Sequence, residues 1–159
     1  MATTTACPAD CFLTRGRKAL IAALQADVCL NSLVKRWFTF AEGLLERVDL
    51  RAADCPQIQA YPAQGAVDVP TNVYDHFTYD INVGMATDWQ DVSPCFRILC
   101  AVLRVVRTAG RSRLGLTGDC LLSVVPLRFQ FKPYQSDTDP RIRWQCILAV
   151  RLSWNRRLP

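Results

Sequence analysis

The chain has 159 residues, of which 50% are hydrophobic and 21% are charged, enough for one globular domain with a core and too few for two. Nineteen Lys and Arg residues against 14 Asp and Glu residues give a formal net charge of +5. Eight cysteines accompany a single histidine, which excludes enzymes and metal sites built on several histidines. We expect a single domain over residues 1–159, with residues 1–14 as an N-terminal arm.

The first residues, Met1-Ala2-Thr3-Thr4-Thr5-Ala6-Cys7-Pro8, contain neither a basic nor an apolar run, so they predict no secretory signal. No apolar stretch approaches the roughly 20 residues that cross a bilayer. The cysteine content is nevertheless typical of proteins in an oxidising environment. A protein assembled in the cytoplasm and later exposed outside the cell satisfies both observations.

The first half of the chain predicts one helix and two strands. Apolar residues recur at helical spacing from about Arg17 to Leu30, including Val28 on the buried face. The pattern of 31–53 is mixed: Trp37, Phe38 and Phe40 are compatible with a strand, and 42–47 with one or two further helical turns. Prolines bracket a short predicted strand at 55–62. Alternating apolar and polar residues over 76–83 then predict a strand with one dry and one wet face.

The second half begins with Ser93-Pro94, a typical helix start. The predicted helix ends near Gly110 and has an apolar face opposite an arginine-rich one. One strand follows from Leu121 to Phe131 as a single alternating row, in which Pro126 indicates an edge or a bulge. The strand over 142–154 alternates throughout. We therefore predict an α+β fold: a mainly antiparallel sheet with a long C-terminal hairpin and two principal helices packed on one face.

Charge is unevenly distributed along the chain. Residues 61–95 contain five acids and no base, whereas 96–159 contain 12 bases and three acids. These segments can meet either between subunits, as complementary surfaces, or within one chain. The first alternative makes the following residues candidates for a subunit or partner interface: Arg97, Arg104, Arg107, Arg111, Asp75 and Asp80.

The order of elements resembles the tail terminator, or tail-completion, proteins of tailed bacteriophages. The resemblance rests on the opening helix, the proline-bounded segment 55–62, the alternating strand through 79–83, the Ser93-Pro94 helix and the closing hairpin that ends in 149–154. It implies a structural virion protein at the tail-neck junction, assembled in the host cytoplasm as a ring of six subunits, with no catalytic residue, cofactor or membrane. The implied partners are the tail tube, a neck or connector protein, and in some tails the sheath. A head-to-tail connector or neck ring is the nearest alternative, and DNA in the channel is a further non-specific contact.

Placing the cysteines on the predicted elements divides them into two groups. Cys95, Cys146 and, at the end of the first helix, Cys29 are expected to be buried thiols. The remaining five are expected in loops or on the surface, as candidates for disulfides between neighbouring virion subunits: Cys7, Cys11, Cys55, Cys100 and Cys120. Cys7 and Cys11 have the spacing of half a zinc site, but no second close pair completes four ligands, so we expect no metal.

Two other function classes, nucleic-acid binding and enzymatic catalysis, fit the sequence less well. The arginine cluster from Arg97 to Arg113, with Trp144 and Trp154, is compatible with nucleic-acid binding, although both tryptophans fall on the row assigned to the core. An enzyme is disfavoured, because nothing in the sequence pairs His76 with a nucleophile and the segment 110–118 matches no phosphate-binding pattern.

Overall fold

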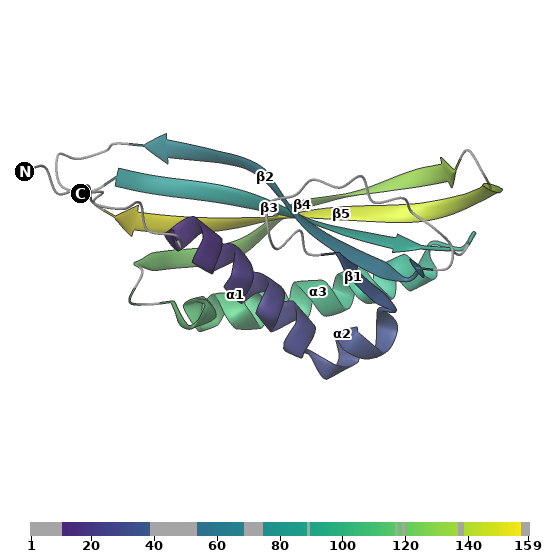
Figure 1. Ribbon diagram of the computed structural model, residues 1–159, viewed down its shortest axis with the longest axis horizontal. Helices are drawn as coiled ribbons and strands as arrows, with labels where there is room; N and C mark the ends of the chain where they lie inside the picture. The colour runs from purple at the N-terminus through teal and green to yellow at the C-terminus, as the bar shows by residue number, and fades with distance from the viewer. Residues whose placement is uncertain are drawn as a thin grey trace, which may run out of the picture.

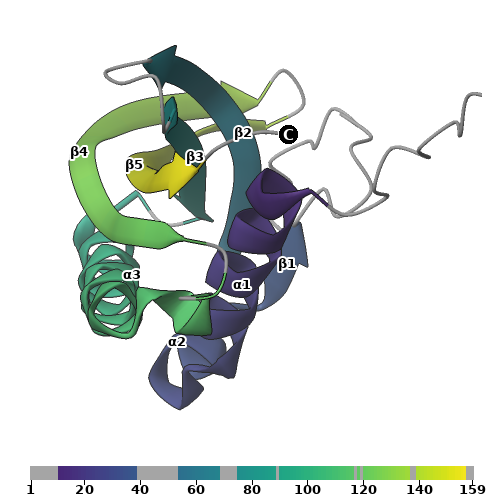
Figure 2. The same ribbon diagram turned by 90° about the vertical axis from the view of Figure 1, so that its left-hand side faces the viewer.

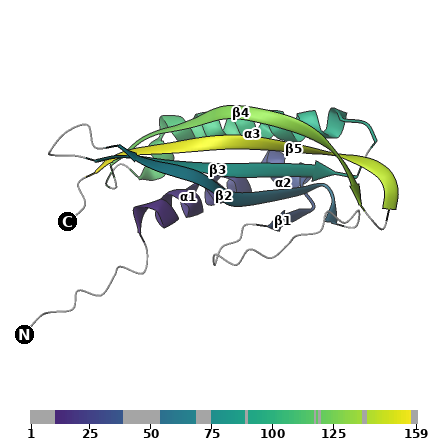
Figure 3. The same cartoon turned by 90° about the horizontal axis from the view of Figure 1, so that it is seen from above.

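The computed structural model describes residues 11–38, 54–68, 75–88, 90–116, 118, 120–136 and 139–156. Within these residues, three α-helices cover one face of a five-stranded sheet (Figure 1), which confirms the predicted α+β class. The strand order is β1-β2-β3-β5-β4, and Figure 3 shows β4 at one edge with β1 and β2 at the other. All pairings are antiparallel except that of β1 with β2.

The N-terminal helical region is divided in two. Helix α1 spans Phe12–Ala26 and α2 spans Val28–Leu33, where one helix over 17–30 was predicted. The Asp27 carboxylate accepts a hydrogen bond of 2.8 Å from the Leu30 amide and so caps α2. The break turns Val28 out to 83% exposure, so its predicted burial is wrong. Helix α1 begins at Phe12, within the predicted N-terminal arm of residues 1–14.

Helix α3 (Ser93–Arg111) matches its prediction. Its apolar face is buried in the core: Cys95, Ile98, Leu99, Val102, Val105 and Val106. The cap differs from the prediction, because Ser93 is the first helical residue and does not cap the helix with its hydroxyl. The Asp91 carboxylate instead accepts hydrogen bonds from the Ser93 amide at 2.9 Å and from the Ser93 hydroxyl at 2.8 Å. A short 3₁₀ turn, η2 (Arg113–Gly115), follows the helix.

The sheet strands are longer than predicted. β1 spans Arg36–Phe38, β2 Gln57–Asp68, β3 Asp75–Thr87, β4 Leu121–Ser136 and β5 Asp139–Arg156. β3 and β5 pair without interruption over 13 residues of β3, and their helix-facing side chains form the centre of the core with Trp154 fully buried. The predicted alternation of β5 is confirmed, whereas the possible helical turns at 42–47 lie outside the described residues.

The outer strands bend around the central pair. Figure 2, a view along the strands, shows β2 and β4 curving on either side of β3 and β5, with the helices grouped below. The register shifts once in β2, between Pro62 and Gln64, and once in the middle of β4, between Pro126 and Arg128. Bulges of this kind bend a strand and increase its twist. The prediction that Pro126 marks an edge or a bulge is confirmed on both counts.

Candidate interaction surface

The outer strand β4 carries large apolar side chains that the described residues leave partly exposed. Leu122, Val125, Leu127 and Phe129 are between 41% and 52% exposed. We call these four residues the β4 edge. Exposed apolar residues on an edge strand are typical of a surface that binds another chain.

The sequence pattern predicts a different placement of these side chains. A single alternating row from Leu121 to Phe131 would have buried Val125, Leu127 and Phe129 together. The register shifts near Leu121 and Pro126 break that row, and Val124 is buried in place of Val125. The proline was visible in the sequence, but the direction of each side chain after the bulge depends on the pairing with β5.

Aromatic contacts extend the β4 edge towards the start of α3. The Phe129 and Phe131 rings lie 5.7 Å apart, and Phe131 lies 5.0 Å from Phe96 of α3, in edge-to-face geometry. Phe96 is 46% exposed. Such pairs are favourable beyond the area they bury, so this apolar surface is held in a defined arrangement before any partner binds.

Among the described residues, the opposite edge of the sheet is also unpaired over much of its length. The three residues of β1 pair only with 57–59 of β2. Beyond them, residues 62–67 are all exposed, and we call this segment the β2 edge. Its side chains are small or flexible: Pro62, Ala63, Gln64, Gly65, Ala66 and Val67.

The sheet face opposite the helices carries a charged pair that joins the acidic and basic segments. The Asp80 carboxylate accepts hydrogen bonds from Arg151 Nε at 2.7 Å and Arg151 Nη2 at 2.9 Å, and one from Gln64 Nε2 at 3.0 Å. Asp80 is buried, while the Arg151 side chain is 36% exposed. At Asp80 the two segments therefore meet within one chain, which was the second of the two alternatives.

This pair should make folding stability depend on pH. The hydrogen bonds from Arg151, and then Gln64, lower the pKa of Asp80, although burial opposes them. Because the pKa is lower in the folded than in the unfolded chain, the stabilisation is complete above the unfolded value of about 3.9 and is lost as the pH falls through the folded value. We expect Asp80→Asn to cost about 1–2 kcal/mol near neutral pH and progressively less below about pH 4. Urea denaturation from about pH 2.5 to pH 7 checks this expectation, and a pH-independent difference would contradict it.

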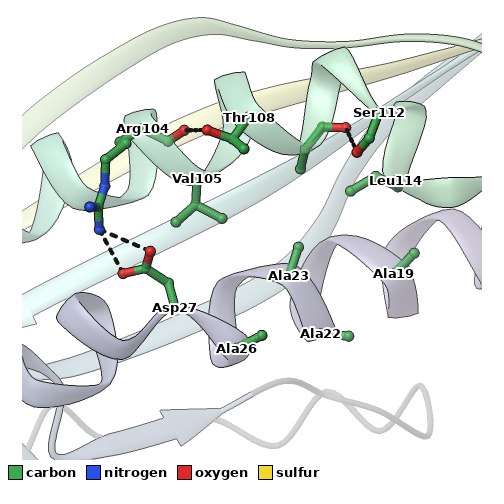
Figure 4. A pocket seen from close by; sticks show the side chains of 11 residues that line it. Ala19, Ala22, Ala23, Ala26, Asp27, Arg104, Val105, Thr108, Ser112 and Leu114 are labelled. Atoms are coloured by element: carbon green, nitrogen blue, oxygen red, sulfur yellow. Dashed lines mark hydrogen bonds and ion pairs between the residues drawn. The ribbon is translucent and has the colours of Figure 1, made fainter.

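The arginines of α3 are exposed, as predicted, but one of them is already paired. Arg104 Nη2 lies 2.8 and 2.9 Å from the two carboxylate oxygens of Asp27. This contact bridges α3 and the junction of α1 with α2, at one end of a groove of about 690 Å³ between α1 and α3 (Figure 4). Arg97, Arg107 and Arg111 are exposed, and Asp75 is half-buried at the start of β3.

The cysteines divide differently from the prediction. Cys95 and Cys146 are buried as expected, but Cys29 is exposed and Cys55 is buried. Cys29 was expected to be buried, and it is exposed because the chain breaks at Asp27. Cys55 packs against Ala86 and Tyr134, and burial raises its pKa to about 11.

The other candidate disulfide cysteines within the described residues are exposed: Cys11, Cys100 and Cys120. A hydrogen bond with the Thr14 side chain lowers the pKa of Cys11, which favours the reactive thiolate. All seven described cysteines are free thiols, and Cys7 lies outside the described residues.

The remaining candidates within the described residues are His76, Trp144 and Trp154. His76 Nδ1 lies 3.4 Å from Asn155 Oδ1 on the open sheet face, and the described residues contain no cluster of three potential metal ligands. Trp154 is fully buried, and the Trp144 indole N–H donates to the Gln90 carbonyl at 2.8 Å. Neither ring is presented for stacking on a base. None of the described helices is long and apolar enough to cross a membrane.

The fold is similar to that of a known virion component. No protein family and no curated protein matches the sequence. Among solved structures, a chain of the virion of a native gene transfer agent particle is similar with a TM-score of 0.59 and 14% sequence identity. The likeness covers 92% of this chain and 100% of the other. At this identity it shows a shared fold.

Proposed function

We propose that the protein is a structural component of a phage-like virion, and that six copies form a ring that caps the tail tube and joins it to the neck. The observation that carries this proposal is the likeness of fold over the full length of a virion chain. The order of elements supports the finer assignment, through the resemblance to tail terminators.

The surfaces of the subunit are suited to assembly. A ring is built from heterologous contacts, in which one surface of each subunit binds a different surface of the next. The β4 edge and the β2 edge are two such surfaces on opposite sides of the sheet. An apolar edge that remained uncovered would promote aggregation, whereas a closed ring covers every copy of it.

Other surfaces remain for the neighbours of the ring. We assign the exposed α3 arginines Arg97, Arg107 and Arg111 to contacts with the tube or neck, or to phosphates of DNA in the channel. We expect the exposed residues Cys11, Cys100 and Cys120 to form disulfides with neighbouring subunits once the particle is in an oxidising medium. We do not extend this role to Cys55, because it is buried.

Electron microscopy and analytical ultracentrifugation of the purified protein test the proposal. We expect six-fold annuli with a mass near six times the 17.9 kDa of the chain. Added to growing tail tubes, the rings should stop elongation. A twelve-fold ring would instead indicate a connector, and a monomer with salt-dependent binding to DNA would indicate the nucleic-acid alternative.

A further inference from the structure

We propose that the ring contact is a β-strand pairing, in which the β4 edge of one subunit adds to the β2 edge of the next copy and the sheet continues from subunit to subunit. This inference rests on the proposed ring and names the surfaces that close it. The occupant of each open edge is therefore a second copy of the same chain.

The two edges lie at the same height on the sheet. Across the ladder, Phe129 of β4 lies opposite Leu148, and Leu148 lies opposite Val83. Val83 in turn lies opposite Ala60 of β2. The same steps from Leu121, through Trp154 and Phe77, reach Val67. The exposed apolar stretch of β4 therefore spans the same level as the part of β2 that β1 leaves open.

The irregularities of the two edges also coincide. Pro126 lies opposite Val150, and Val150 lies opposite Ile81. Ile81 lies opposite Pro62. The register shift of each strand follows directly after its proline. Both edges thus bend at one level, and both lack an amide donor there. Two strands that bend at the same level can pair with each other both before and after the bend. A straight strand could not follow the bend of either edge.

Strand direction permits the pairing. Three antiparallel pairings separate β2 from β4, so the two strands run in opposite directions. In the proposed ring the symmetry axis runs along the strands, and a rotation about such an axis leaves the direction of every strand unchanged. The β4 strand of one subunit and the β2 strand of its neighbour would therefore pair antiparallel, as most of the sheet does.

The side chains are complementary in size. The β4 edge presents leucine, valine and phenylalanine, whereas the β2 edge presents alanine and glycine at its centre. A Cβ atom on Gly65 would lie 3.0 Å from the Thr78 carbonyl oxygen, so the strand is closely backed there by β3. Small residues leave room outside the strand for the large side chains of a neighbour, and burying those side chains would favour association.

Two pairs of lysine substitutions test the contact. The first, Val125→Lys with Leu127→Lys, changes only the β4 edge, and the second, Ala66→Lys with Val67→Lys, changes only the β2 edge. Val28→Lys is the matched control, because Val28 is an exposed apolar residue on α2 away from both edges. Circular dichroism establishes that each variant is folded, and sedimentation and electron microscopy measure its assembly.

We expect the control to form rings and each edge variant to associate at least about tenfold more weakly. An equimolar mixture of the two edge variants should give heterodimers and no rings, since each variant keeps one intact surface and the two intact surfaces are complementary. Rings that persist in either edge variant would overturn the strand pairing. Homodimers of the β2-edge variant would also overturn it, because they indicate that β4 pairs with itself.

Hydrogen exchange of the wild-type ring provides a second measurement that needs no variant. The amides of 63–67 and of the β4 strand should be protected in the ring to the same degree as those of β5. Rapid exchange at these edges in an intact ring would contradict the pairing and leave the proposed function standing. A wild-type protein that stays monomeric would contradict both.

Discussion

Replacing Trp154 with alanine is expected to lower the free energy of unfolding by about 3–5 kcal/mol. The side chain has no exposed surface and packs edge-to-face on Phe12 of α1, with ring centroids 5.3 Å apart. The Trp154 ring also packs closely against α1: a Cβ atom added at Gly16 of that helix would come within 2.6 Å of the ring. Truncation would therefore leave a cavity between β5 and α1.

Trp154→Phe is the control for this prediction. It retains an aromatic ring against Phe12 and removes an indole N–H that has no acceptor among the described residues, so we expect a cost below about 1.5 kcal/mol. Urea denaturation followed by far-ultraviolet circular dichroism, at one fixed protein concentration, measures both variants. Equal stabilities of Trp154→Ala and Trp154→Phe would contradict the expected cavity.

Replacing Gly110 with alanine should destabilise the protein by about 1–3 kcal/mol, although alanine is favoured over glycine inside a helix by about 1 kcal/mol. A Cβ atom at this position would lie 2.6 Å from the Val124 carbonyl oxygen. That oxygen belongs to the backbone of β4, which the β5 ladder holds in place. The end of α3 and the strand would have to move apart.

Gly118→Ala is the matched control, because no described residue other than Gly118 itself has an atom within 4 Å of the added methyl group. Its stability should change by less than about 0.5 kcal/mol. Thermal unfolding of the two variants at equal concentration makes the comparison. A Gly110→Ala protein as stable as the wild type would show that α3 can shift away from β4 at little cost.

The exposed apolar surface on β4 could be predicted only in part. The sequence shows an apolar strand interrupted by Pro126, which is enough to predict an edge or a bulge. A bulge moves every later side chain relative to the partner strand, and its direction depends on the register with β5. The β2 edge was harder still to predict from the sequence. It is unpaired only beyond the point where β1 ends, and β1 is a very short strand that lies far from β2 in the sequence.

The charge pattern of the chain likewise predicted the structure only in part. An excess of acids in 61–95 and of bases in 96–159 is a fact of composition, and it left open whether the two segments meet within or between subunits. The contact of Asp80 with Arg151 joins positions 71 residues apart, through the pairing of β3 with β5. Arg104 and Asp27 meet through the packing of α3 against the helical region at the N-terminus.

Local periodicity by itself determined the α+β class, the buried face of α3 and the alternation of β3 and β5, because these depend on neighbours a few residues apart. Only the tertiary structure decided the break at Asp27, the burial of Cys55 in place of Cys29, and the two open edges at one height. These features depend on which distant segments pair and in which register, and that is set by the packing of the whole core.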